Sequence, residues 1–272
     1  MSNGIAQNHL AQYCRLKTHL QSPRTSADSD SVAPADLLWE CPPEALTLAG
    51  GEIHVWRARL DDDVGDLEPF SAILSEEESV RAARYLFEKD RKRFILRRSL
   101  LREILSRYLN TEPARLRFAY GPHGKPALAF PCQDDFQFNL SHSEGLAVYA
   151  VTRVGAVGVD IERVRVIREA EQIAARYFSP QETAGWLSSP SDRLAESFLR
   201  YWSRKEARLK VNGRGIFDLE ERSRGPEAAE RDEPSSKPRC SVPHSEGVLY
   251  ELTPATDYIG ALALAVPGVV RD

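Results

Sequence analysis

Apolar and polar positions follow two different periods along this chain, and each period predicts one kind of element. Between residues 90 and 109 apolar side chains recur every three or four residues, which predicts a long helix. A second helix is predicted over residues 191–211, before a glycine that is placed to end it. Short apolar segments bounded by turn residues predict strands at 52–60, 116–120, 136–140, 146–152, 156–162, 248–252 and 258–266.

Two helix starts are marked by capping boxes. In this pattern a Ser side chain and a Glu three residues later satisfy free backbone N–H groups of the first turn. Ser75 with Glu78 and Ser179 with Glu182 both have it. The pattern predicts that helices begin directly after Ser75 and Ser179.

The order of these elements predicts an α+β fold made of two halves, each a small sheet with helices on it. Residues 1–36 are polar and rich in Ser, Gln and Asn, so we expect a flexible lead-in. The N-terminal half then covers residues 37–155 and the C-terminal half residues 156–272. Within the second half, residues 220–245 are charged, rich in Pro and poor in large apolar side chains, which predicts a flexible insertion.

Composition narrows the class of protein. The 272 residues are 42% hydrophobic, enough for a sizeable core, and the net charge of −4 argues against a protein that coats nucleic acid. The four cysteines are scattered without a Cys-x-x-Cys pair, which favours reduced thiols over a zinc site. No apolar run is long enough to span a membrane and no secretion signal is visible, so we expect a cytoplasmic enzyme or binding protein.

Carboxylates in two segments indicate the chemistry. Asp160 and Glu162 alternate with apolar residues in a predicted strand, so both side chains leave the same face. Glu206 and Lys210 are four residues apart in a predicted helix and share a face with Trp202. If strand and helix pack together, three acids and one ammonium converge, a set that suits Mg²⁺ and substrate phosphates. The alternative is that the acids are solvated surface charges and Trp202 a core residue.

Other polar residues are candidates for contact with an anionic ligand. Ser141 and His142 lie at the end of a predicted strand, where they either donate hydrogen bonds to a phosphate or simply form a polar turn. Lys125 lies in a Gly-Lys-Pro bend, but the rest of a P-loop is missing, which leaves a nucleoside triphosphatase unsupported. Arg93 and Arg97 share one face of the basic helix, much of which we expect to be solvated.

Taken in order, these motifs resemble those of the 4′-phosphopantetheinyl transferases of the Sfp (surfactin-synthetase) type. The resemblance runs from about residue 75 to residue 266. It rests on the LLRxxL helix, the GKP turn, SHS after a strand, GVDIE, and WSRKEARLK followed by Gly-x-Gly. It implies a monomer built as a pseudo-twofold pair of α+β halves, with coenzyme A bound in the cleft between them.

The resemblance also implies roles for individual residues. Asp160, Glu162 and Glu206 would bind Mg²⁺, with Mn²⁺ as a substitute. Glu206 would take a proton and Lys210 would stabilise the leaving phosphate, which makes them the catalytic pair. The contacts to coenzyme A would be Arg81, Arg93, Lys125, Ser141, His142, Asp160 and Lys210, with His142 and Arg81 at the 3′-phosphate. One departure is Glu78, which stands where some relatives have a basic residue.

The reaction implied by the resemblance moves the phosphopantetheine arm of coenzyme A to a serine of an apo carrier protein and releases adenosine 3′,5′-bisphosphate. The carrier could be of the fatty-acid, polyketide, peptide-synthetase or aminoadipate-reductase type. A basic patch on the enzyme would steer an acidic carrier toward the site. Two alternatives are an Mg²⁺-dependent hydrolase of a nucleotide pyrophosphate and a non-catalytic module that binds coenzyme A or a carrier protein.

Overall fold

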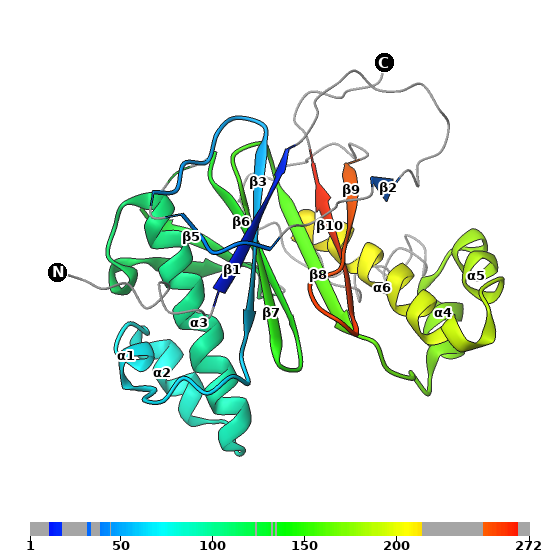
Figure 1. Ribbon diagram of the computed structural model, residues 1–272, viewed down its shortest axis with the longest axis horizontal. Coiled ribbons are helices and arrows are strands. Elements are labelled where there is room, and N and C mark those ends of the chain that lie inside the picture. Colours follow the sequence, from blue (N-terminus) through cyan, green and yellow to red (C-terminus); the bar gives the residue numbers. More distant parts are fainter. Residues whose placement is uncertain are drawn as a thin grey trace, which may run out of the picture.

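The structure is a computed structural model that describes residues 39–43, 45–122, 124–131, 133, 135–213 and 247–265, together with the backbone of residues 11–17 and 32–33. Two four-stranded sheets lie next to each other, and helices cover the outer side of each (Figure 1). No helix within these ranges is long and apolar enough to cross a membrane. The mixture of helices and sheets agrees with the predicted α+β class.

The N-terminal half contains the first sheet, in the order β1-β3-β7-β6 with antiparallel neighbours. Its strands are β1 (Ala11–Lys17), β3 (Glu52–Arg59), β6 (Gln137–Ser143) and β7 (Leu146–Thr152). Its helices are α1 (Glu68–Ser71), α2 (Glu76–Ala83) and α3 (Glu88–Leu109). A separate hairpin pairs β4 (Arg117–Tyr120) with β5 (Pro126–Phe130).

The C-terminal half contains the second sheet, in the order β2-β9-β10-β8. Its strands are β2 (Val32–Ala33), β8 (Val157–Arg163), β9 (Val248–Leu252) and β10 (Tyr258–Leu264). Its helices are α4 (Ala170–Tyr177), α5 (Pro180–Leu187) and α6 (Leu194–Val211). The predicted division between residues 155 and 156 falls in the turn that joins β7 to β8.

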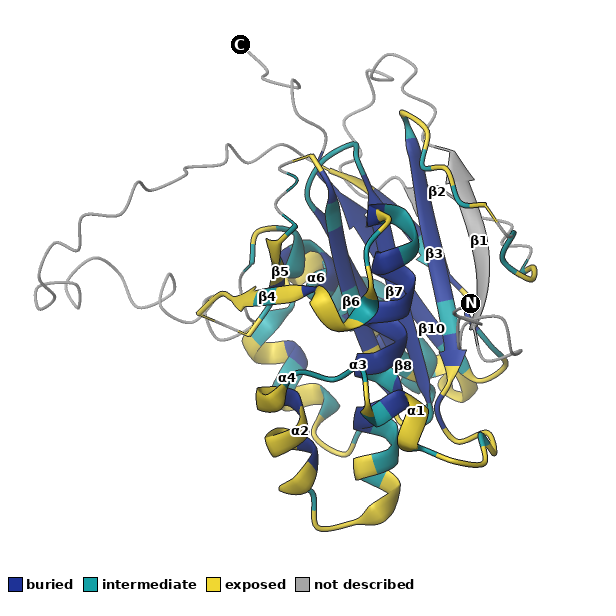
Figure 2. Cartoon of the chain, turned by 90° about the vertical axis from the view of Figure 1, so that its left-hand side faces the viewer, coloured by how far each residue is buried: buried dark blue, intermediate teal, exposed yellow. Residues whose placement is uncertain are grey.

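Apolar side chains are buried on both faces of the first sheet, as the dark strands in Figure 2 show. On one face, Leu100 and Ile104 of α3 pack with Trp56 in one buried cluster. On the other face, Val55 packs with Val159 of β8 in a second cluster that lies between the two sheets. The layers therefore run from α3 through the first sheet and the second sheet to α6.

Helix α6 lies unusually close to β8 because Gly158 has no side chain. A Cβ atom at Gly158 would lie 2.1 Å from the carbonyl oxygen of Ala207, a distance no packed structure tolerates. The glycine therefore lets the helix backbone rest directly on the strand. This contact brings the face of α6 that carries Glu206 and Lys210 against Asp160.

Most elements fall where the hydrophobic pattern predicted them. Both capping boxes are confirmed, with Ser75 and Glu78 at the start of α2 and Ser179 and Glu182 at the start of α5. Helix α4 and strand β5 were not predicted. Helix α4 has only eight residues, so its apolar face of Ala170, Ile173 and Ala174 is too short to stand out as a helical period in the sequence. In β5 only the first residue is buried, so the strand lacks a clear alternation.

Residues 1–36 differ in part from the prediction of a flexible lead-in. Residues 11–17 form β1, which pairs along its whole length with β3, and residues 32–33 form β2 beside β9. Without β1, the edge strand β3 would leave a row of backbone N–H and C=O groups free to pair with another segment. The polar composition of residues 11–17 does not reveal that they are this segment. The prediction does not hold for these two segments. The rest of residues 1–36 and the predicted insertion at 220–245 lie outside the described residues.

Candidate active site

The two sheets meet along their edge strands β6 and β8, and side chains take the place of a backbone ladder. Alternate side chains of β6 accept hydrogen bonds from alternate N–H groups of β8, across a junction that we call the β6–β8 seam. The bonds are Val159 N–H to Asn139 Oδ1 at 2.9 Å, Ile161 N–H to Ser141 Oγ at 3.3 Å, and Arg163 N–H to Ser143 Oγ at 3.1 Å. The predicted motif SHS is therefore part of the joint between the halves.

Asp160 lies at the centre of this seam and is buried, with 6% of its surface exposed. Its Oδ1 atom accepts a hydrogen bond from Ser141 Oγ at 3.0 Å and forms an ion pair with Lys210 Nζ at 2.7 Å. Its Oδ2 atom is buried and has no hydrogen-bond partner among the described residues. A buried carboxylate oxygen without a partner is costly, so this atom is poised to bind a cation or donor.

The other two predicted acids flank Asp160. Glu162 Oε2 accepts hydrogen bonds from Ser143 Oγ at 2.9 Å and from Arg165 Nη1 at 3.1 Å. Burial raises the pKa of Glu206, and the negative charges of Asp160 and Glu162 raise it further against the effect of Lys210. The charges of Asp160 and Glu162 therefore reach Glu206.

The three acids are not arranged as a complete metal-binding site. Within the described ranges, no group of three His, Cys, Asp or Glu side chains is close enough to hold a metal ion. The donor set nevertheless fits a hard cation such as Mg²⁺, because it offers carboxylate oxygens, one of which is buried and unpartnered at Asp160. Lys210 supplies the positive charge next to Asp160 in the structure.

A pocket of about 300 Å³ lies beside these acids and takes its lining from both halves. The N-terminal half contributes three arginines, a lysine and a histidine, and the C-terminal half contributes Glu206 and Lys210 from α6. The basic residues and the histidine from the N-terminal half are Arg81, Arg97, Arg98, Lys125 and His142. A basic pocket with a carboxylate in its wall suits a polyphosphate ligand bound next to a cation site.

Lys125, from the Gly-Lys-Pro turn, fastens the two halves together. Its ammonium group donates to the carbonyl oxygens of Lys210 at 2.5 Å and Val157 at 3.2 Å. Burial, aided by the charge of Lys210, lowers the pKa of Lys125 to about 8. The bond to Lys210 satisfies a carbonyl group at the end of α6, where cations are favourable. Lys125 therefore fixes the end of the helix that carries Lys210.

Glu78, which stands where some relatives have a basic residue, pairs with two arginines of α3. Its buried carboxylate binds Arg98 Nε at 2.8 Å and Arg102 Nε at 2.7 Å, and Arg98 also donates to the Tyr120 hydroxyl at 2.7 Å. Burial alone would raise the pKa of Glu78, but the charges of Arg98 and Arg102 hold it below its usual range. Glu78 thus holds Arg98 in the pocket wall.

Comparison with known proteins agrees with this geometry. A family model described as the 4′-phosphopantetheinyl transferase superfamily matches residues 156–261, and one described as the N-terminal part of 4′-phosphopantetheinyl transferases matches residues 63–153. The 4′-phosphopantetheinyl transferase HetI of Nostoc sp. is 37% identical over 84% of this chain and 93% of its own length. The chain belongs to the 4′-phosphopantetheinyl transferase superfamily.

Further relatives in this superfamily share shorter regions. A putative 4′-phosphopantetheinyl transferase of Synechocystis sp. is 31% identical over 68% of both chains. The 4′-phosphopantetheinyl transferase Sfp of Bacillus subtilis is 32% identical over 55% of this chain and 64% of its own length. The resemblance to the Sfp type is thereby confirmed.

Among the residues that this superfamily resemblance implied, Arg93 is near enough to His142 for its charge to act there, but it is paired with Asp61. Its guanidinium group binds both carboxylate oxygens of Asp61, at 2.7 and 2.6 Å, and it does not line the pocket. Arg97, one helical turn further along α3, does line it, and so does its neighbour Arg98. Sequence spacing placed Arg93 and Arg97 on one face but could not reveal that Asp61 binds the first of them.

His142 lines the pocket as the superfamily resemblance implied, and the described structure leaves its ring neutral at pH 7. Partial burial lowers the pKa of His142 to about 4, and the charges of Arg97, Lys210 and Arg93 act in the same direction. The three positive charges near His142 repel one another, and a bound phosphate would reduce this repulsion.

Three residues of the site have roles that the sequence reasoning did not assign. Asn139 and Ser143 form the β6–β8 seam together with Ser141, and Glu78 orients Arg98. Alternation of small polar residues along Asn139, Ser141 and Ser143 is a signal that could have indicated a polar face on β6. No local pattern could have indicated the partner of Glu78, because Arg98 lies on another helix.

Proposed function

We propose a residue-level assignment for the reaction of this superfamily. The enzyme transfers the 4′-phosphopantetheine arm of coenzyme A to a serine of an apo carrier protein and releases adenosine 3′,5′-bisphosphate. The observation that carries the assignment is the basic pocket lined by Glu206 and Lys210, with Lys210 Nζ 2.7 Å from Asp160 Oδ1. A nucleotide and a pyrophosphate need these two environments side by side.

Asp160, Glu162 and Glu206 are the residues that would hold Mg²⁺, or Mn²⁺ in its place. When bound there, the cation supplies charge neutralisation for the pyrophosphate. The unpartnered Oδ2 atom of Asp160 supports this assignment. Lys210, already 2.7 Å from Asp160 Oδ1, would turn toward the phosphate once that carboxylate has another partner.

Glu206 is assigned as the base. The serine oxygen forms a bond to the phosphorus that carries the pantetheine arm, and the bond from that phosphorus to the oxygen of adenosine bisphosphate breaks. Glu206 takes the serine proton, directly or through one water. Lys210 donates to the leaving phosphate and stabilises the charge that develops there.

The remaining pocket residues bind the nucleotide. We assign His142 and Arg81 to the 3′-phosphate and Arg97 and Arg98 to the pyrophosphate side, in place of Arg93. Ser141 contributes by orienting Asp160 through its 3.0 Å hydrogen bond. Lys125 contributes by fixing the end of α6, and its ammonium group also borders the pocket.

We further propose that the carrier is acidic around its serine and that the enzyme acts as a cytoplasmic monomer. The test is a panel of apo carriers of the fatty-acid, polyketide, peptide-synthetase and aminoadipate-reductase types, each incubated with coenzyme A and Mg²⁺. We expect the mass of at least one carrier to increase by the phosphopantetheine arm. Release of adenosine bisphosphate without a carrier would indicate a hydrolase, and no turnover with any carrier would contradict transfer.

A further inference from the structure

The turn between α2 and α3 exposes apolar side chains that the core does not use. Leu86 is 94% exposed, Phe87 71% and Val80 48%. Single exposed apolar residues are ordinary, but three within eight positions form a patch of the kind that binds another molecule. Of the described residues, this is where large exposed apolar side chains come closest together in sequence.

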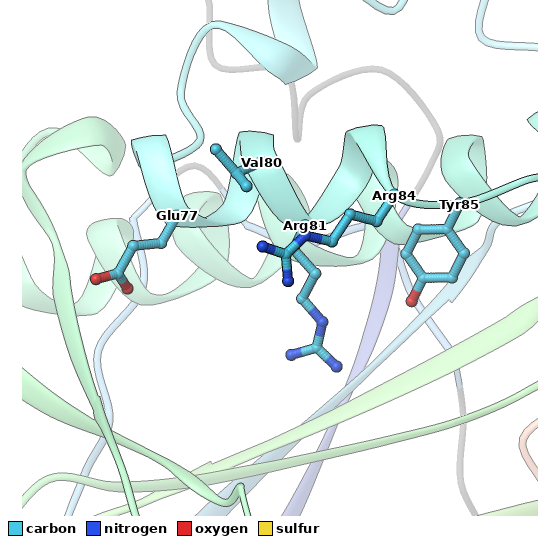
Figure 3. Close-up of a pocket in the computed structure, with 5 residues that line it drawn as sticks. All are labelled: Glu77, Val80, Arg81, Arg84 and Tyr85. Carbon is cyan, nitrogen blue, oxygen red and sulfur yellow. The ribbon is translucent and has the colours of Figure 1, made fainter.

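An open groove of about 670 Å³ lies along the same segment and is lined by Glu77, Val80, Arg81, Arg84 and Tyr85. Figure 3 shows Arg81 and Tyr85 reaching from α2 and the turn after it into the space below the helix, with Glu77 at the far end. Val80 and two arginines therefore line this groove, and the exposed Leu86 and Phe87 follow its last lining residue, Tyr85, directly in the sequence. We call Val80, Arg81, Arg84, Leu86 and Phe87 the α2–α3 corner.

The two arginines of this corner differ from the other basic residues nearby. Lys89 and Arg93 bind Asp61, and Arg91 binds Glu88. Arg81 and Arg84 make no ion pair with any carboxylate in the part of the chain that the structure describes, although Arg81 lies over the Phe94 ring at 5.5 Å. Two uncompensated guanidinium groups beside apolar side chains are complementary to a surface that is acidic and partly apolar.

The corner is also continuous with the proposed active site. Arg81 lines both the open groove and the smaller pocket that contains Glu206 and Lys210. A partner that covers the corner would therefore lie next to the bound coenzyme A. A protein substrate has to approach in this way, because its serine must reach the phosphate.

We propose that the α2–α3 corner is a docking surface for the apo carrier protein, with Leu86 and Phe87 as apolar anchors and Arg84 facing acidic side chains of the carrier, next to Arg81 at the bound coenzyme A. This inference rests on the proposed transfer. It is specific to the protein substrate, because Leu86 and Phe87 do not line the coenzyme A pocket. Buried apolar and Arg anchors dominate the free energy of such interfaces.

The test replaces both anchors by serine, in the double variant Leu86→Ser and Phe87→Ser. Since neither side chain is buried, we expect the thermal unfolding temperature to match that of the wild type. The KM for the carrier should rise by about tenfold or more, with the KM for coenzyme A unchanged. The matched control is Leu187→Ser, which removes another exposed leucine, from α5 in the other half, and should change neither KM.

A second measurement separates docking from chemistry. The probe is a carrier whose modified serine is replaced by alanine, labelled for fluorescence anisotropy, and its Kd should rise in the double variant by about as much as the KM. Arg84→Ala should weaken binding less, by about threefold, and should reduce its dependence on salt.

Three results would overturn the docking proposal. An unchanged carrier KM and Kd in the double variant would remove the corner from the interface. Sedimentation that shows a wild-type dimer and a monomeric double variant with normal carrier KM would make the corner a contact between two copies of this chain. A wild-type enzyme that modifies no carrier would refute the transfer itself, and the docking proposal with it.

Discussion

The two halves share one plan, a four-stranded sheet backed by a long helix, yet the helices carry opposite kinds of residue toward the cleft. Helix α3 presents Arg97 and Arg98, while α6 presents Glu206 and Lys210. In the N-terminal half, the buried carboxylate of Glu78 pairs with Arg98. The C-terminal half leaves the Oδ2 atom of Asp160 unsatisfied among the described residues. Under the proposed assignment, this difference means that one half binds the nucleotide and the other carries the reacting groups.

The largest expected effect comes from Asp160→Ala in the reacting half. Transfer should fall by more than about 100-fold, because even outer partners of metal ligands cost 10–100-fold when removed. Binding of Mn²⁺, followed by its electron paramagnetic resonance, should weaken in parallel. The matched control is Asp61→Ala in the binding half, which removes a carboxylate from an exposed pair with Arg93. If both variants behaved alike, the division of labour between the halves would be wrong.

Glu78→Ala tests the binding half at its most buried ion pair. It leaves the charges of Arg98 and Arg102 without their carboxylate, so the free energy of unfolding should fall by about 3–5 kcal/mol. Denaturant unfolding measures this, and Glu88→Ala, which breaks an exposed pair with Arg91, should change it by no more than about 0.5 kcal/mol. A loss of equal size in both variants would mean that burial does not distinguish the two pairs.

Ser143→Ala tests the seam that connects the halves. It removes the hydrogen bond to Glu162 at 2.9 Å and one of the bonds to the β8 backbone. We expect kcat/KM to fall by about tenfold, the lower end of the effect of outer metal partners. Apparent Mn²⁺ affinity should fall as well. Ser79→Ala, on the exposed face of α2, should leave both quantities at wild-type values.

His142→Ala separates binding from reaction. The KM for coenzyme A should rise by about tenfold, because a hydrogen bond to a charged phosphate is lost. With 3′-dephospho-coenzyme A as substrate the variant should differ little from the wild type. Equal effects on both substrates would move His142 away from the 3′-phosphate.

The smallest expected effect concerns pH. The pKa of His142 is about 4 in the folded protein, below its ordinary value of 6.5. Between these two pH values His142 is protonated in the unfolded chain but neutral in the folded protein. The free energy of unfolding therefore declines as the pH falls from 6.5 toward 4. Thermal unfolding of His142→Gln and wild type should diverge across this window and run in parallel above it. A constant difference over the whole range would contradict the shift.

Local sequence signals were enough to predict the helices with capping boxes, the strands other than β1, β2 and β5, and the positions of the acids on β8 and α6. They worked because each depends on neighbours within about one helical turn or two strand positions. The partner of Glu78, the binding of Arg93 to Asp61 and the bonds from Asn139 to the backbone of β8 depend on contacts between distant segments. Periodicity carries no information about such contacts, so only the structure could reveal them.

The position of Lys125 has a consequence for how the enzyme is made. A ribosome releases the chain from its N-terminus, so the first sheet, the Gly-Lys-Pro turn and the side chains of β6 leave the tunnel before β8 and α6. When the second segment emerges, its strand finds hydrogen-bond acceptors already in place on β6 and its helix end finds an ammonium group. We therefore expect the N-terminal half to serve as a template on which the second half is completed during synthesis.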